Sequence, residues 1–165
     1  MGNVIVLGNG LLGSAFKEYE IPVISHEDCD ITSQFDIDAV IAKYHPDVIV
    51  NAAGITPKAM FDVLDTFRVN SLGPKLLAKA CDEHEIRLVQ ISTDCVFDGK
   101  KGGYVEIDQV SPSDSYGLSK ALGEITEFPH LTIRTSFVGL PDPKGRGLLA
   151  WAANEKVVTG YGKVS

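Results

Sequence analysis

A glycine-rich turn separates the first apolar run of the chain from the first segment with helical periodicity. Residues 3–7 read as a strand, and the motif Gly-Asn-Gly-Leu-Leu-Gly at residues 8–13 follows directly. In a strand–turn–helix context this GxGxxG spacing is typical of dinucleotide binding. Gly8 allows the tight turn, Gly10 lets the backbone approach a pyrophosphate, and Gly13 lets the helix pack close to the sheet. The N–H groups that begin the helix attract an anion. The alternative interpretation is a structural turn without a ligand.

Short β-branched runs alternate with longer segments of helical periodicity. This alternation predicts an α/β fold, a Rossmann-type doubly wound parallel sheet with helices on both faces. The expected strands are residues 3–7, 23–24, 48–50, 87–92 and 131–135, with a strand-like run at 157–158. The expected helices are residues 11–19, 36–44, 69–84, 115–128 and 148–155. Because 165 residues suffice for one core, we expect a single NAD(P)-binding domain over residues 1–165.

Two segments interrupt this regular alternation. Residues 98–113 are polar and rich in glycine, and they are longer than an ordinary connection between elements. Long loops in compact domains are often functional. Residues 161–165 end the chain soon after a strand-like run, with no terminal helix to cover it. From this pattern we expect that the C-terminal part of the fold is missing from the sequence.

Composition and charge exclude several functional classes. The formal net charge is −7 and the pI is about 5.0, whereas a nucleic-acid phosphate backbone is normally met by a basic stripe. No run approaches the roughly 20 apolar residues that cross a bilayer, and no basic leader begins the chain. We therefore expect a cytoplasmic protein without nucleic-acid or membrane partners. The cysteines and histidines lack ligand spacing, so we expect no metal site.

The four residues after the second expected strand bear on the choice of cofactor. An acidic residue about 20 positions beyond the glycine motif would bond the adenosine ribose of NAD. Ser25, His26, Glu27 and Asp28 occupy this region, and no arginine stands there to favour a 2′-phosphate. Glu27 or Asp28 could serve NAD. The sequence does not place the strand end at one residue, so NAD and NADP both stay open.

A phenol and an ammonium lie four positions apart in a segment that we expect to be helical. Tyr116 and Lys120 therefore share one helix face. A nearby cation lowers the pKa of a phenol below about 10, which would let Tyr116 exchange a proton near neutral pH. Thr93 follows the fourth expected strand, where ligands of open α/β sheets bind, and can donate to a carbonyl oxygen. The alternatives are a solvated helix face and a hydroxyl that bonds local backbone.

Several further motifs occur along the chain. The ordered set is more specific than any single motif. The motifs are Asp30-Ile31-Thr32, Pro-Asp-Val-Ile-Val-Asn-Ala-Ala-Gly at 46–54, Val69-Asn70, Ser-Thr-Asp-Cys-Val-Phe-Asp-Gly at 92–99, Tyr-Gly-Leu-Ser-Lys-Ala-Leu-Gly-Glu at 116–124 and Ile-Arg-Thr-Ser at 133–136. Together with the glycine motif they resemble the extended short-chain dehydrogenase/reductase family. Within it the chain is most similar to the dTDP-4-dehydrorhamnose reductase branch, over nearly its whole length.

The resemblance implies a catalytic set of Thr93, Tyr116 and Lys120. In this set Tyr116 donates a proton, Lys120 lowers the pKa of Tyr116, and Thr93 polarises the substrate oxygen. The hydride comes from the cofactor, NAD or NADP. Asp94 and Cys95 are implied on the substrate side.

The resemblance also implies a cofactor cradle built from small residues and strand ends. In it, Ala52, Ala53 and Gly54 line the ribose and nicotinamide, while Asp30 and Ile31 flank the adenine. Asn70 packs beside the active-site strand, where a purely structural role stays open. The implied cofactor-binding residues are Gly8, Gly10, Leu11, Leu12, Gly13, Asp30, Ile31, Ala52, Ala53, Gly54, Asn70 and Lys120.

The implied activity is NAD(P)H-dependent reduction of a 4-keto sugar nucleotide such as dTDP-4-dehydrorhamnose, and homodimer formation is compatible with it. Three features depart from the family pattern. The glycine motif is one residue shorter than GxxGxxG, Cys95 stands where the reductases have a tyrosine, and the C-terminal substrate-binding domain is largely missing. The alternatives are a sugar-nucleotide epimerase or dehydratase that keeps its cofactor bound, and a non-catalytic regulatory subunit of the same fold.

Overall fold

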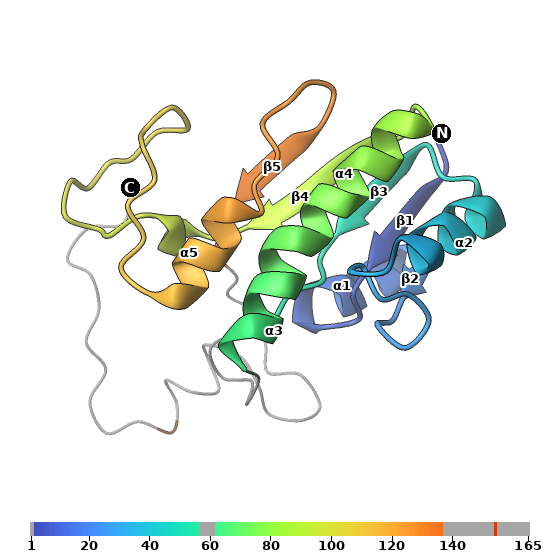
Figure 1. Cartoon of the computed structure of the whole chain (residues 1–165), viewed down its shortest axis with the longest axis horizontal. Coiled ribbons are helices and arrows are strands. Elements are labelled where there is room, and N and C mark those ends of the chain that lie inside the picture. The colour runs from blue at the N-terminus through green and yellow to red at the C-terminus, as the bar shows by residue number, and fades with distance from the viewer. Residues whose placement is uncertain (1, 57–61, 137–153, 155–165) are drawn as a thin grey trace.

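Parallel strands form the central sheet of the protein (Figure 1). The computed structural model describes residues 2–56, 62–136 and 154. Its strands are β1 (Val4–Leu7), β2 (Val23–Ile24), β3 (Val48–Asn51), β4 (Arg87–Ser92) and β5 (Leu131–Arg134). They lie in the order β2-β1-β3-β4-β5, and each neighbouring pair is parallel. The predicted parallel sheet is confirmed, and each of these strands agrees with its expected range to within one residue at either end.

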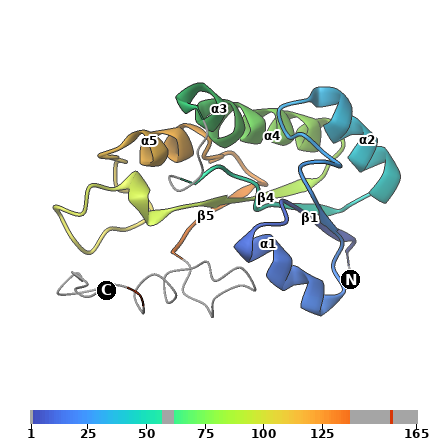
Figure 2. The same ribbon diagram turned by 90° about the horizontal axis from the view of Figure 1, so that it is seen from below.

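Helices cover the sheet on both faces. They are α1 (Leu11–Ala15), α2 (Gln34–Tyr44), α3 (Val63–Phe67), α4 (Gly73–Glu83) and α5 (Ser115–Leu122). The described residues also form two 3-10 turns, η1 (Phe16–Tyr19) and η3 (Asp94–Val96), and one π-helical turn, η2 (Arg68–Leu72). Figure 2 shows α1 on one face of the sheet and α2, α3, α4 and α5 on the other. The doubly wound arrangement is therefore confirmed.

The chain reverses its direction across the sheet at β1. From β1 it passes through α1 to β2, and it then returns over the other face through α2 to β3. In such sheets ligands bind beyond the carboxyl ends of the two strands at the reversal. Gly8 follows β1 and Ala52 follows β3, and the Ala52 N–H donates to the Leu7 carbonyl at 2.9 Å. Two of the expected cofactor segments therefore meet at this point.

The hydrophobic core holds these strand ends in place. Ile5 and Val6 of β1 are fully inaccessible to solvent, as expected for a parallel strand buried on both faces. Burying a side chain of this size stabilises the fold by roughly 1.5–3 kcal/mol. The helices contribute the buried core residues Ile37 and Ile41 from α2 and Leu77 and Cys81 from α4. The site at the carboxyl edge of the sheet thus rests on a packed core.

The helix expected at residues 69–84 begins earlier and changes its winding. It starts as α3 at Val63, passes through the π-helical η2, and continues as α4 to Glu83. Pro74 has no amide hydrogen to donate to the carbonyl four residues before it. That carbonyl belongs to Asn70, which lies in η2. The upstream turn escaped prediction because its apolar side chains face outward: Leu64 is 71% exposed.

The helix expected at residues 115–128 ends at Leu122, so its predicted end was wrong. Gly123 caps it, and a Cβ at Gly123 would lie 1.9 Å from the carbonyl oxygen of Asn70. The chain packs against η2 at this glycine and then turns toward β5. The helix expected at 148–155 lies outside the described residues except for Asn154, as does the strand-like run at 157–158.

Candidate active site

The glycine turn is enclosed by the ends of β1 and β3. Gly8 has a φ of +100°, and a Cβ there would lie 2.6 Å from the backbone nitrogen of Ala53. A Cβ at Gly13 would lie 1.7 Å from the carbonyl oxygen of Gly8, so α1 packs directly on the turn. A Cβ at Gly10 would meet nothing within 4 Å. Packing therefore requires two of these glycines, while the third faces open space.

The small residues after β3 connect this turn to α5. A Cβ at Gly54 would lie 3.2 Å from Oδ1 of Asn70 and 3.6 Å from Nζ of Lys120. The expected nicotinamide side and the expected catalytic helix are therefore in contact.

Asn70 clamps the loop after β3 to α5. Its side chain is buried and accepts from the Ile55 N–H at 2.8 Å, and it donates to the Ile55 carbonyl at 2.9 Å. It also donates to Oγ of Ser119 at 3.0 Å, and this hydroxyl donates to the Tyr116 carbonyl at 2.7 Å. Both amide hydrogens of Asn70 are thus used within the protein, which favours its structural interpretation.

Thr93, Tyr116 and Lys120 are brought together at the carboxyl end of β4. Thr93 follows the last residue of that strand, and its hydroxyl is close enough to the Tyr116 phenol to lower the pKa of that phenol. Asp114 begins α5 by accepting from the Gly117 N–H at 2.7 Å, which places Tyr116 in the first turn. Lys120 lies one turn further on and is only 7% exposed. A phenol, a hydroxyl and an ammonium therefore lie at this strand end, where Lys120 adjoins Gly54 of the loop after β3.

The electrostatics of Tyr116 differ from our expectation. Burial raises the pKa of the phenol, the neighbouring Cys95 thiol adds to this increase, and the hydrogen bond with Thr93 opposes it. The net shift is opposite to the lowering that we expected from Lys120, because loss of hydration dominates and the ammonium donates to the Ile91 carbonyl. A phenol that stays protonated at neutral pH is nevertheless the state that a proton donor requires.

Burial also shifts Lys120. It lowers the pKa of the ammonium from 10.5 to about 8, while the negative charge of Glu124 opposes this effect. Lys120 is therefore close to titrating in the neutral to mildly alkaline range.

Asp94 and Cys95 form the turn η3 beside these groups. The Thr93 hydroxyl donates to Oδ1 of Asp94 at 3.1 Å and accepts from the Cys95 N–H at 3.2 Å. Ser136 donates to the other Asp94 oxygen at 2.6 Å, and the Cys95 thiol is exposed. The two residues expected on the substrate side thus adjoin the expected catalytic residues.

The residues expected around the adenine make local structural contacts, and their role toward the adenine stays a prediction. Ile31 is buried, and a Cβ at Gly73 would lie 2.7 Å from its Cδ1. Asp30 accepts from the Thr32 N–H and hydroxyl, each at 2.8 Å, and so closes a local turn. Neither contact reaches the glycine turn.

The structure places the end of β2 at Ile24, which the sequence left open. The Gly8 N–H donates to the Ile24 carbonyl at 2.8 Å, so the strand end adjoins the glycine turn. Ser25 follows directly and its hydroxyl donates to Asp28 at 2.7 Å. Asp28 is therefore the carboxylate linked to the strand end.

Residues 1–145 match the family model described as the RmlD substrate binding domain. This chain belongs to that family. The dTDP-4-dehydrorhamnose reductase of Aggregatibacter actinomycetemcomitans is 38% identical over 135 residues, which cover 75% of this chain and 46% of the relative. That of Mycobacterium tuberculosis is 32% identical over 170 residues, covering 96% of this chain and 54% of the relative. The chain therefore spans about half the length of the curated relatives it matches.

Solved structures of the same group share this fold. A dTDP-4-dehydrorhamnose reductase from Clostridium acetobutylicum aligns with a TM-score of 0.75 and 27% identity, over 92% of this chain and 58% of its own. The enzyme from Bacillus anthracis, solved in complex with NADP, aligns with a TM-score of 0.68 and 31% identity over 74% of this chain and 47% of its own. The resemblance inferred from the ordered motifs is confirmed.

Two residues of this RmlD-family chain have roles that the sequence did not predict. A Cβ at Gly117 would lie 2.2 Å from the Cys95 carbonyl oxygen, so only glycine lets α5 approach η3. Ser119 is fully buried and bridges Asn70 to the Tyr116 carbonyl. Both residues lie between Tyr116 and Lys120 in the sequence, and this position was the signal that could have identified them.

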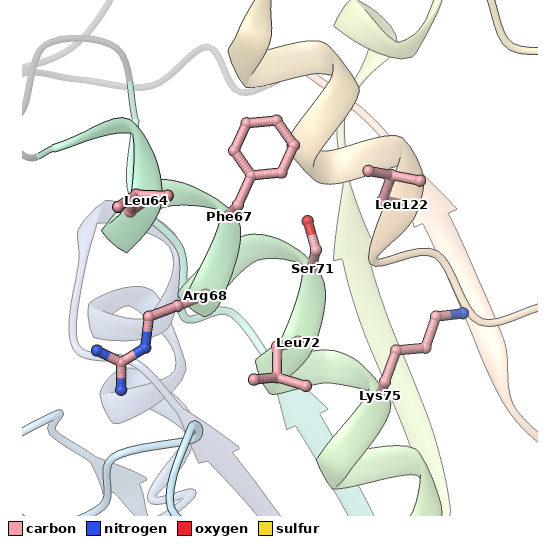
Figure 3. Close-up of a pocket in the computed structure, with 7 residues that line it drawn as sticks. All are labelled: Leu64, Phe67, Arg68, Ser71, Leu72, Lys75 and Leu122. Carbon is pink, nitrogen blue, oxygen red and sulfur yellow. The ribbon is translucent and has the colours of Figure 1, made fainter.

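A separate apolar groove lies between the α3–α4 segment and α5 (Figure 3). Its lining residues are Leu64, Phe67, Arg68, Ser71, Leu72, Lys75 and Leu122. It contains none of the expected site residues of this RmlD-family chain. Across the part of the chain that the structure describes, no three His, Cys, Asp or Glu side chains cluster as metal ligands. No described helix has the length and apolar character needed to cross a membrane.

Proposed function

We propose that this chain is the dinucleotide-binding part of an NAD(P)H-dependent reductase acting on a 4-keto sugar nucleotide such as dTDP-4-dehydrorhamnose. The observation that carries the proposal is the close packing of the first turn of α5, which holds Tyr116, on the turn that follows Thr93. A Cβ at Gly117 would lie 2.2 Å from the Cys95 carbonyl oxygen, and Lys120, one helical turn beyond Tyr116, donates to the Ile91 carbonyl at the same strand end. The names of its relatives, and the NADP in the Bacillus anthracis structure, support this assignment.

The glycine turn fits a dinucleotide. The open space at Gly10 leaves room for a pyrophosphate to approach the backbone, and no side chain caps the N-terminus of α1. Leu11, Leu12 and the flanking glycines would surround that group. Ala52, Ala53 and Gly54 would face the nicotinamide side, where Gly54 adjoins Lys120. When bound, the reduced nicotinamide supplies the hydride.

The three clustered side chains supply the remaining chemistry. On substrate binding the Thr93 hydroxyl exchanges its hydrogen bond to Asp94 for one to the substrate carbonyl oxygen, which it polarises. Tyr116, whose pKa burial raises above the ordinary value of a phenol, transfers its proton to that oxygen as the carbonyl becomes an alcohol. Lys120 provides positive charge on the same helix face, which stabilises the phenolate that forms. One hydride and one proton complete the reduction.

The test uses the full-length protein, because this chain spans about half of its relatives. It is mixed with NADH or NADPH and a 4-keto-6-deoxy sugar nucleotide, and the reduced cofactor is followed by absorbance. Loss of cofactor in proportion to substrate is the expected result. No loss with tightly retained cofactor would indicate an epimerase or dehydratase, and no loss with weak binding would indicate a regulatory subunit.

A further inference from the structure

A buried carboxylate lies directly behind the Thr93, Tyr116 and Lys120 cluster. The Glu124 side chain is 6% exposed. Its Oε1 accepts from Oγ of Ser92 at 2.7 Å and from Nε of Arg134 at 2.8 Å, and its Oε2 accepts from Nη2 of Arg134 at 2.8 Å. Such a two-pronged arginine–carboxylate pair has a specific geometry as well as strength. Because Ser92 precedes Thr93, the pair is bonded to the strand end that carries the Thr93 hydroxyl.

Arg134 extends this connection to the long loop. Its Nη1 donates to the Glu106 carbonyl at 3.1 Å. Its guanidinium carbon lies 5.0 Å from the ring centroid of Phe97, which stacks on Tyr104 at 4.2 Å. One buried ion pair therefore joins β4, β5, the segment after α5, and the loop that follows η3.

Glu124 is also the charged group that acts on Lys120. Tyr116 is the titratable neighbour on the same helix. From other elements, the Ile91 carbonyl of β4 accepts from Lys120 and the Gly54 backbone after β3 lies beside it, and neither group titrates. The negative charge of Glu124 therefore favours the protonated ammonium against the effect of burial.

We propose that Glu124 and Arg134 are positioning residues for the reductase reaction. Their ion pair holds the Thr93 strand end and the loop after η3 against α5, and it places a carboxylate one helical turn beyond Lys120. This inference rests on the proposed function, because it assigns these roles toward the proposed catalytic groups.

The first test is Glu124→Gln in the full-length protein. Glutamine keeps the shape of the side chain and removes its charge. Lysines labelled at the ε carbon are titrated by NMR, with the Lys120 signal assigned from Lys120→Arg. We expect the Lys120 midpoint to fall by more than about half a unit, as loss of a nearby opposite charge requires. We also expect kcat to fall by about tenfold or more with its alkaline limb at lower pH, while the dinucleotide Kd changes by less than about threefold.

An unchanged Lys120 midpoint and an unchanged alkaline limb would overturn the proposal even if the variant were less stable. If the wild-type protein shows no turnover, the proposed function fails, but the NMR titration still tests the placement of Glu124.

Two further variants separate positioning from simple stability. The double variant Glu124→Gln/Arg134→Met removes both charges of the ion pair, so Arg134 is not left without its carboxylate, and it replaces the single variant if that one does not fold. It should show the same lowered midpoint, and a wild-type midpoint with wild-type kcat would contradict the proposal. His130→Ala is the stability control, because it removes the acceptor of the Leu88 N–H at 3.1 Å, near the start of β4. It should lower Tm without moving the Lys120 midpoint.

Discussion

Nζ of Lys120 donates a hydrogen bond of 2.7 Å to the carbonyl oxygen of Ile91, two residues before Thr93. This bond ties α5 to the strand that carries the Thr93 hydroxyl. It also holds the ammonium in a site that is only 7% exposed. The backbone of β4 therefore sets the position of Lys120 relative to the two hydroxyl groups. The chemistry of the site depends on the register between one helix and one strand end.

Tyr116→Phe should largely abolish turnover, because it removes the proposed proton donor and keeps the aromatic ring. We expect kcat to fall by about 10²–10⁴-fold, the usual contribution of a positioned acid or base. Dinucleotide affinity should change little, since the substitution leaves the glycine turn intact. Steady-state kinetics and a fluorescence titration with reduced nicotinamide measure the two quantities. Tyr19→Phe is the matched control, because Tyr19 is 75% exposed and lies in η1. Survival of turnover in Tyr116→Phe would rule out this proton donor.

Lys120→Met should change how stability depends on pH. The Lys120 pKa is about 8 in the folded chain against 10.5 ordinarily, so the unfolded chain binds more protons between these values. The wild type therefore becomes more stable as the pH rises from about 8 to 10.5, and it loses this added stability as the pH falls back through 8. The unfolding free energy of the wild type relative to the variant should therefore increase by about 2–3 kcal/mol from pH ~7 to ~10. Urea denaturation across this range measures it, and a constant difference would contradict the buried, charged lysine.

Gly10→Ala and Gly13→Ala should separate ligand binding from folding. A Cβ at Gly10 meets nothing within 4 Å, and the Gly10 φ of −68° suits alanine. This variant should keep its stability within about 1 kcal/mol and bind the dinucleotide more weakly. A Cβ at Gly13 would lie 1.7 Å from the Gly8 carbonyl oxygen, so that variant should lose about 3 kcal/mol or more. Thermal unfolding and isothermal titration test both, and undiminished binding by Gly10→Ala would contradict the pyrophosphate position.

Asn70→Ala should destabilise the loop after β3. The substitution removes two hydrogen bonds to Ile55 and one to Ser119. Leaving such buried groups unpaired should cost about 2–4 kcal/mol, measured by urea denaturation. Gln34→Ala is the control, because it removes an exposed side-chain bond to Asp38, and it should have an effect below about 0.5 kcal/mol. Equal effects of the two variants would show that Asn70 is not a clamp.

The proposed catalytic residues were predictable because each depends on local pattern. Tyr116 and Lys120 share a helix face by their spacing, and Thr93 directly follows a strand that its β-branched run identifies. That these residues lie at one site followed from the rule that ligands of open parallel sheets bind at the carboxyl ends of the strands. The pKa shift of Tyr116 was not predictable, because it depends on how much water the surrounding segments exclude from the phenol.

The sequence by itself determined the alternation of strands and helices, the glycine turn after β1, and the proposed catalytic set, because these follow from periodicity and from residue types at fixed local spacing. Only the tertiary structure decided that Asn70 clamps the loop after β3, that Ile31 lies in the core, and that Glu124 pairs with Arg134. These features depend on which groups, distant in the chain, share the same buried space. There, hydrogen-bond partners and charge are set by packing rather than by neighbouring residues.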